Sequence, residues 1–185
     1  ITYGKNVYGK AEIKAVTNTL KNSTQMGKSV KKFENDIAKY FKKKYALMVN
    51  SGSSAITLAL DSIGIKKNDE IIVPCLNFGT AISAIINKGA KPILVDVKTN
   101  TLQINEKLIE QKITKKTKAL LIPNLIGNIP DWEKIYRIGK KYGLKLIEDS
   151  ADTLGATIKS KSTGCYNDIS ITSFYESVSI GANFE

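Results

Sequence analysis

Short apolar runs alternate with segments of helical periodicity from Tyr45 onward, and this alternation restricts the possible folds more than any other feature of the sequence. The runs are nearly continuous in apolar residues, which is typical of strands buried on both faces of a sheet. Strands that are separated by helices pair in parallel. The sequence therefore predicts an α/β fold of three layers, α/β/α, around a mainly parallel sheet. The expected strands are 46–49, 70–73, 92–95, 119–122, 144–147 and 169–172, and the expected helices are 54–63, 80–88, 105–112 and 131–142.

The N-terminal part of the chain carries apolar residues at helical spacing instead. We expect one helix over 11–20 and a second over 29–41. The chain divides accordingly into an N-terminal helical segment, 1–44, and an α/β domain, 45–185, which is long enough to bury a sizeable core. The apolar positions are Ile13, Val16 and Leu20 in the first helix and Val30, Phe33, Ile37 and Phe41 in the second.

The net charge is +11, but the kind of basic residue argues against a nucleic-acid partner. Arg137 is the only arginine among 28 basic residues, so the forked guanidinium contacts that read phosphate and guanine are almost absent. The lysines follow the polar faces of helical segments, as in Lys42, Lys43 and Lys44, and we expect them to be solvated. No nucleic-acid partner is expected.

Membrane and metal chemistry are not expected either. No apolar run approaches the roughly 18 residues of a membrane helix, and the N-terminus has no signal-peptide core, so the expected location is cytoplasmic. The chain has no histidine, and its two cysteines, Cys75 and Cys165, lack the spacing of zinc ligands. Catalysis by a histidine base is therefore excluded within this sequence.

The sequence NSGSSA at residues 50–55 follows an expected strand and opens an expected helix. A glycine permits close backbone approach, and the first amide groups of a helix carry partial positive charge, so this turn suits an anion such as phosphate. The serine hydroxyls add further donors. The alternative is a simple N-terminal cap with a tight turn. No lysine of the Walker type follows, which argues against a nucleoside triphosphate.

Other polar and aromatic residues follow strands at the edge where α/β proteins build ligand sites. Asp149 follows strand 144–147, and its carboxylate is a metal ligand, a general base, a partner for a cation, or a cap of the next turn. Phe78 follows strand 70–73 and either stacks on a flat cofactor ring or packs beneath a loop. For Asn124 and Asn128, a role in the turn is favoured over ligand binding.

The ordered set of motifs resembles the DegT-type sugar aminotransferases and sugar dehydratases, which are fold type I enzymes that depend on pyridoxal 5′-phosphate (PLP). The likeness covers nearly all 185 residues and matches the N-terminal half of the family pattern. It implies an incomplete fold type I large domain, with the C-terminal small domain absent. The motifs are Gly27 with Phe33-Glu34, SGSSA at 51–55, the segment from Val73-Pro74 to Phe78-Gly79-Thr80, Val95-Asp96, Asn124 to Asn128, EDSADTLG at 148–155, and Ser170 to Tyr175.

The resemblance assigns each site residue a role with PLP or pyridoxamine 5′-phosphate (PMP). Ser53 and Ser54 would bind the phosphate through backbone amides and hydroxyls, and Ser173 would add a further hydroxyl. These three residues would hold one end of the cofactor.

The pyridine ring would meet three other residues. By the same resemblance, Phe78 would stack on the ring, and Asp149 would pair with the protonated ring nitrogen, which strengthens the ring as an electron sink. Asp152 would contact the side that carries the ring hydroxyl. Family members often have Gln or His at this position, and some dehydratases have Asp.

Position 178 departs from the family pattern. Family aminotransferases have a lysine there, five residues after Ser173, that bonds covalently to the cofactor, and the dehydratases have a histidine base. This chain has Val178, and no lysine or histidine follows Lys161. We therefore expect the chain to have no catalytic residue and little or no activity. A truncated or frameshifted gene would explain both Val178 and the missing half.

Three functional hypotheses stay open. The first is an aminotransferase that uses a nucleotide-linked keto-sugar as substrate and an amino donor, commonly glutamate. The second is a 3-dehydratase that acts on a 4-keto-6-deoxy sugar with PMP. The third is a non-catalytic fragment that retains a cofactor cradle. Full-length relatives are dimers whose sites are completed across the interface, so the resemblance also implies a homodimer.

Overall fold

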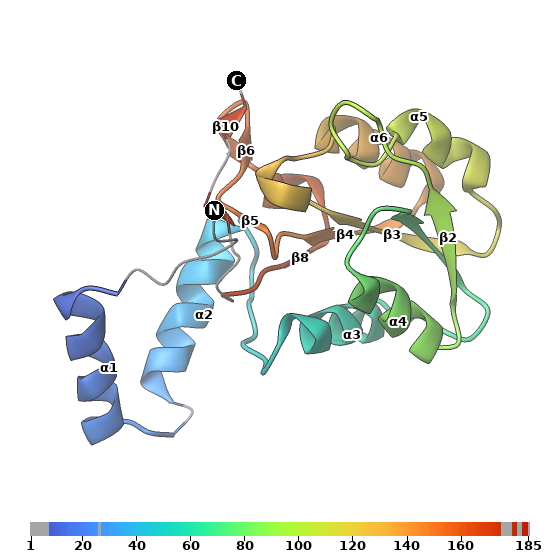
Figure 1. The fold of residues 1–185 in the computed structure, drawn as a ribbon. Coiled ribbons are helices and arrows are strands. Elements are labelled where there is room, and N and C mark those ends of the chain that lie inside the picture. The colour runs from blue at the N-terminus through green and yellow to red at the C-terminus, as the bar shows by residue number, and fades with distance from the viewer. Residues whose placement is uncertain (1–7, 26, 175–178, 181–182, 185) are drawn as a thin grey trace.

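Five parallel strands form the central sheet of the computed structural model, which describes residues 8–25, 27–174, 179–180 and 183–184 (Figure 1). Each adjacent pair of strands runs in parallel, so the predicted sheet type is confirmed. The strands are β1 (Glu70–Pro74), β2 (Lys91–Val95), β3 (Thr117–Pro123), β4 (Lys145–Asp149) and β8 (Ile169–Ile171), in the spatial order β2-β1-β3-β4-β8.

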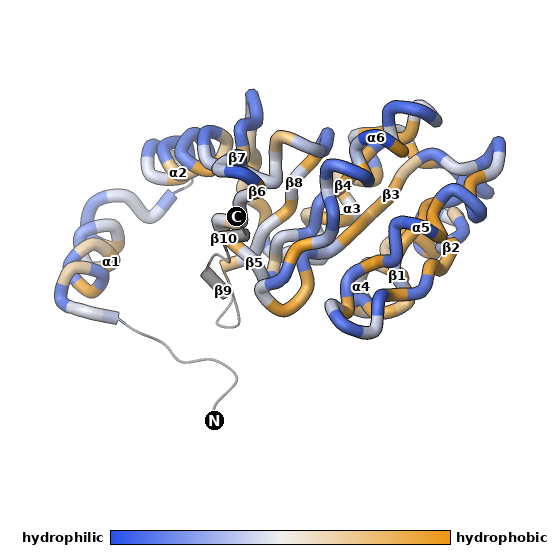
Figure 2. Tube along the Cα trace, turned by 90° about the horizontal axis from the view of Figure 1, so that it is seen from above, coloured by the Kyte–Doolittle hydropathy of each residue, from blue (hydrophilic) through white to orange (hydrophobic). Residues whose placement is uncertain are grey.

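Helices cover both faces of the sheet, which confirms the three layers (Figure 2). On one face pack α3 (Gly52–Ser62) and α4 (Gly79–Asn87); on the other pack α5 (Glu106–Ile109) and α6 (Trp132–Tyr142). Successive side chains of a strand point to opposite faces, so β4 contributes to both cores. Leu146 belongs to the core beneath α6, and Ile147 belongs to the core beneath α3 and α4.

The two N-terminal helices, α1 (Lys10–Asn22) and α2 (Lys28–Tyr40), lie to one side of the sheet (Figure 1). Helix α1 buries none of its residues, and the apolar stripe of Ile13, Val16 and Leu20 is exposed. The end of α2, by contrast, packs on the α/β body through the buried side chain of Phe41. The division at residue 44 stays a prediction.

The expected strand over 46–49 is wrong. These residues have no strand assignment, and Leu47 and Met48 are exposed. The backbone N–H of Met48 donates to Oε1 of Glu34 on α2 at 3.0 Å, so a helix side chain takes the donor that a strand would offer to its neighbour. The apolar pattern was real, but no strand of the described residues pairs with it.

The expected helix over 105–112 is shorter, because α5 gives way to the 3-10 turn η1 (Glu110–Lys112). Several short elements were not predicted, because strands and 3-10 turns of two to four residues are too short to show a periodic pattern. They are η2 (Leu125–Gly127), β5 (Thr153–Leu154), β6 (Thr157–Ile158), β7 (Lys161–Ser162), η3 (Thr163–Tyr166), β9 (Ser179–Ile180) and β10 (Asn183–Phe184).

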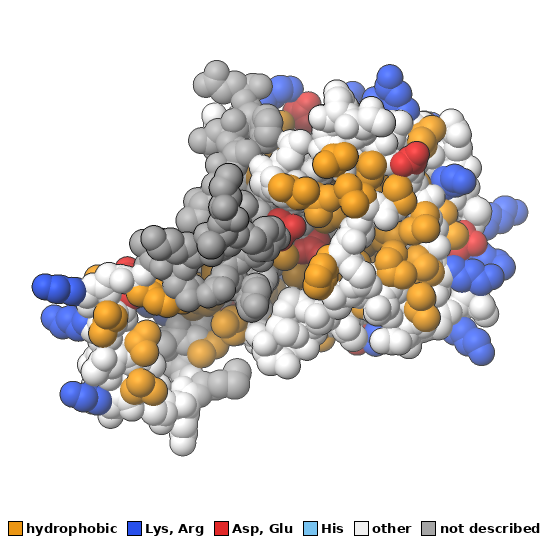
Figure 3. Space-filling model, in the orientation of Figure 1, with side chains coloured by type: hydrophobic (Ala, Val, Ile, Leu, Met, Phe, Trp, Pro, Cys, Tyr) orange, Lys and Arg blue, Asp and Glu red, His pale blue; other side chains and the backbone are white. Residues whose placement is uncertain are grey.

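The surface view shows the described Lys and Arg side chains scattered around the outline of one face, with apolar side chains gathered on its α/β body (Figure 3). Within the described ranges, every helix is too short or too polar to cross a bilayer.

Candidate functional site

The candidate site lies at the carboxyl ends of the sheet strands. The chain passes from β1 to β2 on one side and then returns to β3 on the other, so the strand order reverses between β1 and β3. Open parallel sheets bind ligands outside the carboxyl ends of the strands near such a reversal. Phe78 follows β1, Asn124 follows β3, Asp149 ends β4 and Ser173 follows β8. The topology therefore brings all four to one edge.

The NSGSSA turn begins helix α3 at this edge. Ser51 is the N-cap, and its Oγ accepts the backbone N–H of Ser54 at 3.1 Å. The described residues supply no acceptor to the N–H groups of Gly52 and Ser53, as is normal for a first helical turn. A shallow, open hollow of about 430 Å³ adjoins the turn and is lined by Val49, Ser53, Ser54, Thr57, Leu58 and Asp61.

Ser173 lies beside the same turn. A Cβ atom added to Gly52 would stand 3.9 Å from Cβ of Ser173, which is ordinary van der Waals contact. Ser173 follows β8, whose Ile171 lies opposite Asp149 in the ladder. The NSGSSA turn therefore lies beside Ser173, and Asp149 lies beside Ile171, two residues earlier.

Asp149 is buried at the end of β4 and points to the face covered by α3. Its neighbour Ile147 belongs to the core beneath α3 and α4, and residues two apart on a strand share a face. The pKa of Asp149 is raised to about 6, chiefly because the group is buried. The hydrogen bond from the N–H of Ala151 opposes this rise, and the charges of Asp152 and Glu148 contribute to it. That bond, at 3.1 Å, is the only one the described residues give its carboxylate. A cation would therefore be stabilised strongly here.

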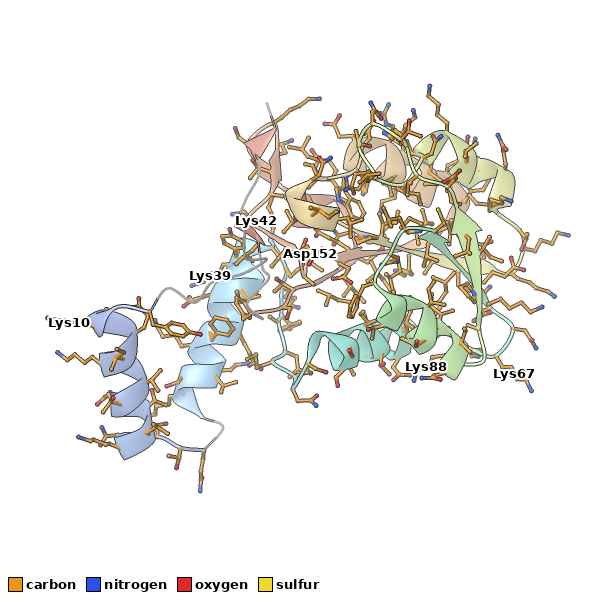
Figure 4. The ribbon with its side chains drawn as sticks, in the orientation of Figure 1. Lys10, Lys39, Lys42, Lys67, Lys88 and Asp152 are labelled. Carbon is orange, nitrogen blue, oxygen red and sulfur yellow. The ribbon has the colours of Figure 1, made fainter. Side chains whose placement is uncertain are left out.

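Phe78 and Asp152 complete the set that the sequence predicts. Phe78 is the N-cap residue of α4, and the residue is 69% exposed. Asp152 is half-buried in the turn after β4, and lies between α2 and the sheet in Figure 4. Val178 lies outside the described residues. The cofactor roles of these residues stay predictions.

A buried polar network behind the site was missed by the sequence analysis. Glu148 is fully buried and accepts hydrogen bonds from four side chains, and Asn124 is part of the same network. Lys43, expected to be solvated, is half-buried and donates to three acceptors, so that expectation is wrong. The EDSADTLG motif marked Glu148, but nothing in the sequence marked Lys43 apart from its neighbours Lys42 and Lys44.

Comparison with known proteins decides the family. The model of the DegT/DnrJ/EryC1/StrS aminotransferase family matches residues 6–185. The chain belongs to this family. Among curated members it is 42% identical over 149 residues to GDP-perosamine synthase of Escherichia coli O157:H7, covering 80% of the chain and 41% of that protein. It is 33% identical over 168 residues to GDP-4-keto-6-deoxy-D-mannose 3-dehydratase of Yersinia pseudotuberculosis, covering 87% and 43%.

Solved structures of a putative sugar aminotransferase and of a sugar dehydratase share the fold. The PLP form of the putative sugar aminotransferase Spr1654 from Streptococcus pneumoniae superposes with a TM-score of 0.88 at 27% identity, over 96% of this chain and 50% of that one. The E. coli GDP-4-keto-6-deoxy-D-mannose-3-dehydratase with bound hydrated PLP gives 0.80 at 34% identity, over 86% and 43%. This family member thus has the fold of part of a fold type I PLP enzyme and spans about half the length of its relatives.

Proposed function

We propose that this chain is the cofactor-binding part of a sugar aminotransferase that acts on a nucleotide-linked keto-sugar with an amino donor. One observation carries the proposal: a buried carboxylate, Asp149, shares a sheet face with the N-terminal turn of α3. A cofactor with a cationic ring nitrogen at one end and a phosphate at the other fits that pair of groups. The names of the relatives support the sugar substrate.

The residues present fit PLP or PMP. At the phosphate end, the N–H groups of Gly52 and Ser53, to which the described residues offer no acceptor, would donate to the phosphate. The hydroxyls of Ser53, Ser54 and Ser173 would add to them. The N–H of Ser54 is already used by Ser51, so the role given to that amide moves to Gly52.

At the ring end, Asp149 would offer its charge to the ring nitrogen, and Phe78 and Asp152 would contact the ring. The cofactor supplies an electron sink for bonds broken next to the substrate nitrogen. Asp149 would hold the proton on the ring nitrogen, because a neighbouring cation favours the ionised carboxylate.

Binding of PMP tests the proposal. PMP is the better probe because it has no aldehyde, and an aldehyde would attach to the many surface lysines. Calorimetric titration of the chain with PMP at pH 8 should show saturable binding of one PMP per chain. Asp149→Asn should weaken it at least tenfold, and Glu110→Gln, an exposed carboxylate paired with Lys141, is the matched control and should leave it unchanged. Equal affinity of wild type and Asp149→Asn would refute the proposal.

A pH series sharpens the same test. As the pH falls through about 6, Asp149 takes up a proton and loses the charge that it offers to the ring nitrogen. Affinity for PMP should therefore fall between pH 8 and pH 5. The phosphate group of PMP also titrates near pH 6, so it contributes to the pH dependence of binding in both proteins. The contribution of Asp149 is the part that wild type shows and Asp149→Asn does not.

The 3-dehydratase is the second candidate, and Asp152 favours it by resemblance. If the chain is incubated with PMP and a GDP-linked 4-keto-6-deoxy sugar, mass spectrometry of any product that forms distinguishes the candidates. An added amino group indicates the aminotransferase, and loss of the 3-hydroxyl indicates the dehydratase. For this 185-residue chain with Val178, we expect PMP binding without either product. Sedimentation of the same sample tests the proposed homodimer.

A further inference from the structure

Both carboxylate oxygens of Glu148 accept hydrogen bonds from two side chains each. Its Oε1 accepts from Nδ2 of Asn124 at 2.7 Å and from Oγ of Ser150 at 2.8 Å. Its Oε2 accepts from Nδ2 of Asn167 at 2.8 Å and from Oγ of Ser170 at 2.7 Å. These donors come from the ends of β3, β4 and β8 and from the loop before β8, so one carboxylate joins three neighbouring strands.

Lys43 connects this network to the N-terminal helices. Its Nζ donates to the carbonyl oxygens of Gly164 at 2.7 Å and Asn167 at 2.6 Å, and to Oδ1 of Asn167 at 2.8 Å. Burial lowers the pKa of Lys43, while the charges of Glu148, Asp168 and Cys165 raise it. Oγ of Ser170 lies 2.7 Å from Oε2 of Glu148 and 2.9 Å from Oδ1 of Asn167, so its single proton lies within reach of both acceptors.

Glu148 faces away from the candidate site. It lies two residues after Leu146, which packs beneath α6, whereas Asp149 faces α3. The main chain is shared, however: the N–H of Asn124 donates to the carbonyl oxygen of Asp149 at 2.8 Å, and the N–H of Ser150 donates to that of Ile171 at 2.7 Å. Fixing the side chain of Glu148 therefore fixes the backbone that aims Asp149.

We propose that Glu148 is a positioning residue, which holds the end of β4 so that Asp149 points toward the α3 turn, and that Lys43 ties the end of α2 to the same support. The proposal rests on the proposed function, because PMP binding is the property that Asp149 serves. Glu148 would touch neither cofactor nor substrate.

A double-mutant cycle tests this proposal, with PMP affinity as the readout. Glu148→Gln keeps the shape but places an amide NH₂ against groups that donate. If Glu148 acts through Asp149, Glu148→Gln should weaken PMP binding about tenfold in the wild-type background and less than twofold in the Asp149→Asn background. A merely structural defect would weaken binding equally in both backgrounds, and that outcome overturns the proposal.

Ser170→Ala is the second, milder arm, because it removes one donor and keeps the carboxylate. It should weaken PMP binding two- to fivefold, again only when Asp149 is present. Thermal unfolding of each variant without PMP confirms that it folds, and Glu110→Gln again serves as the control. If wild type binds no PMP, the proposed function fails as well; if wild type binds and the effects simply add, only the positioning role fails.

Discussion

Glu148 and Asp149 are adjacent carboxylates at the end of one strand, both are buried, and their surroundings are opposite. Four side chains donate to Glu148, whereas a single backbone N–H from the described residues donates to Asp149. A buried carboxylate is stable when hydrogen bonds replace the water that it loses. The carboxylate of Glu148 is therefore satisfied within the chain, and that of Asp149 is left ready for a cation.

Glu148→Gln should cause the largest loss of stability and would sharpen the comparison. The new NH₂ group cannot accept from the donors around it, so at least one buried donor loses its partner. We expect a decrease in the free energy of unfolding of about 3 kcal/mol. Urea denaturation at pH 8 measures this change. A decrease as small as that of the exposed control Glu110→Gln would mean that the network contributes no stability.

Asp149→Asn should act in the opposite direction. The folded-state pKa of about 6 lies above the usual 3.8, so the folded chain holds this proton more tightly than the unfolded chain. The energetic cost of the buried charge is absent below pH 3.8, grows between 3.8 and 6, and is complete above 6. Without cofactor, the free energy of unfolding of the variant should exceed that of wild type by about 3 kcal/mol at pH 8, and by almost nothing near pH 3.5. If Asp149→Asn is less stable than wild type at pH 8, the contrast drawn between Glu148 and Asp149 is wrong.

Gly164→Ala tests how much the packing of the end of α2 against the loop before β8 contributes to stability. A Cβ atom there would overlap the carbonyl oxygen of Phe41, and backbone cannot move aside easily. The expected loss of unfolding free energy is about 2 kcal/mol, without a direct effect on the Asp149 side. Gly79→Ala, where an added Cβ meets nothing within 4 Å, is the matched control. Equal stability of the two variants would show that α2 is not held there.

Ser170→Ala should have the smallest effect. It removes one of the four donors to Glu148 and leaves the other three in place. We expect a decrease of about 1 kcal/mol in the free energy of unfolding, measured by urea denaturation at pH 8. A decrease equal to that of Glu148→Gln would mean that Ser170 alone, rather than the whole network, stabilises the carboxylate.

The fold could be predicted from the sequence because the runs that became the central strands β1 and β3 are nearly continuous in buried apolar residues. The same reasoning failed at 46–49, since an apolar pattern does not show whether a pairing strand lies beside it. Asp149 could be found from its place at a strand end. Which of two adjacent acids faces α3 depends on the register of β4, and neither Leu146 nor Ile147 reveals it, because both are apolar.

The network could not be predicted for a related reason. Lys43 stands between two other lysines, and Asn167 lies far from it in sequence, so only the packing of α2 against the loop before β8 brings them together. Lys43 differs from its neighbours in burial, which depends on tertiary contacts and not on local composition.

The indole of Trp132 donates to Oδ1 of Asn124 at 2.8 Å, and Asn124 in turn donates to Glu148. Trp132 is the only tryptophan of the chain and is completely buried. The protein thus contains its own optical reporter: the wavelength of tryptophan emission follows the polarity around a single known ring. A red shift in any variant would signal that water has reached the support behind the strand ends, without a label attached.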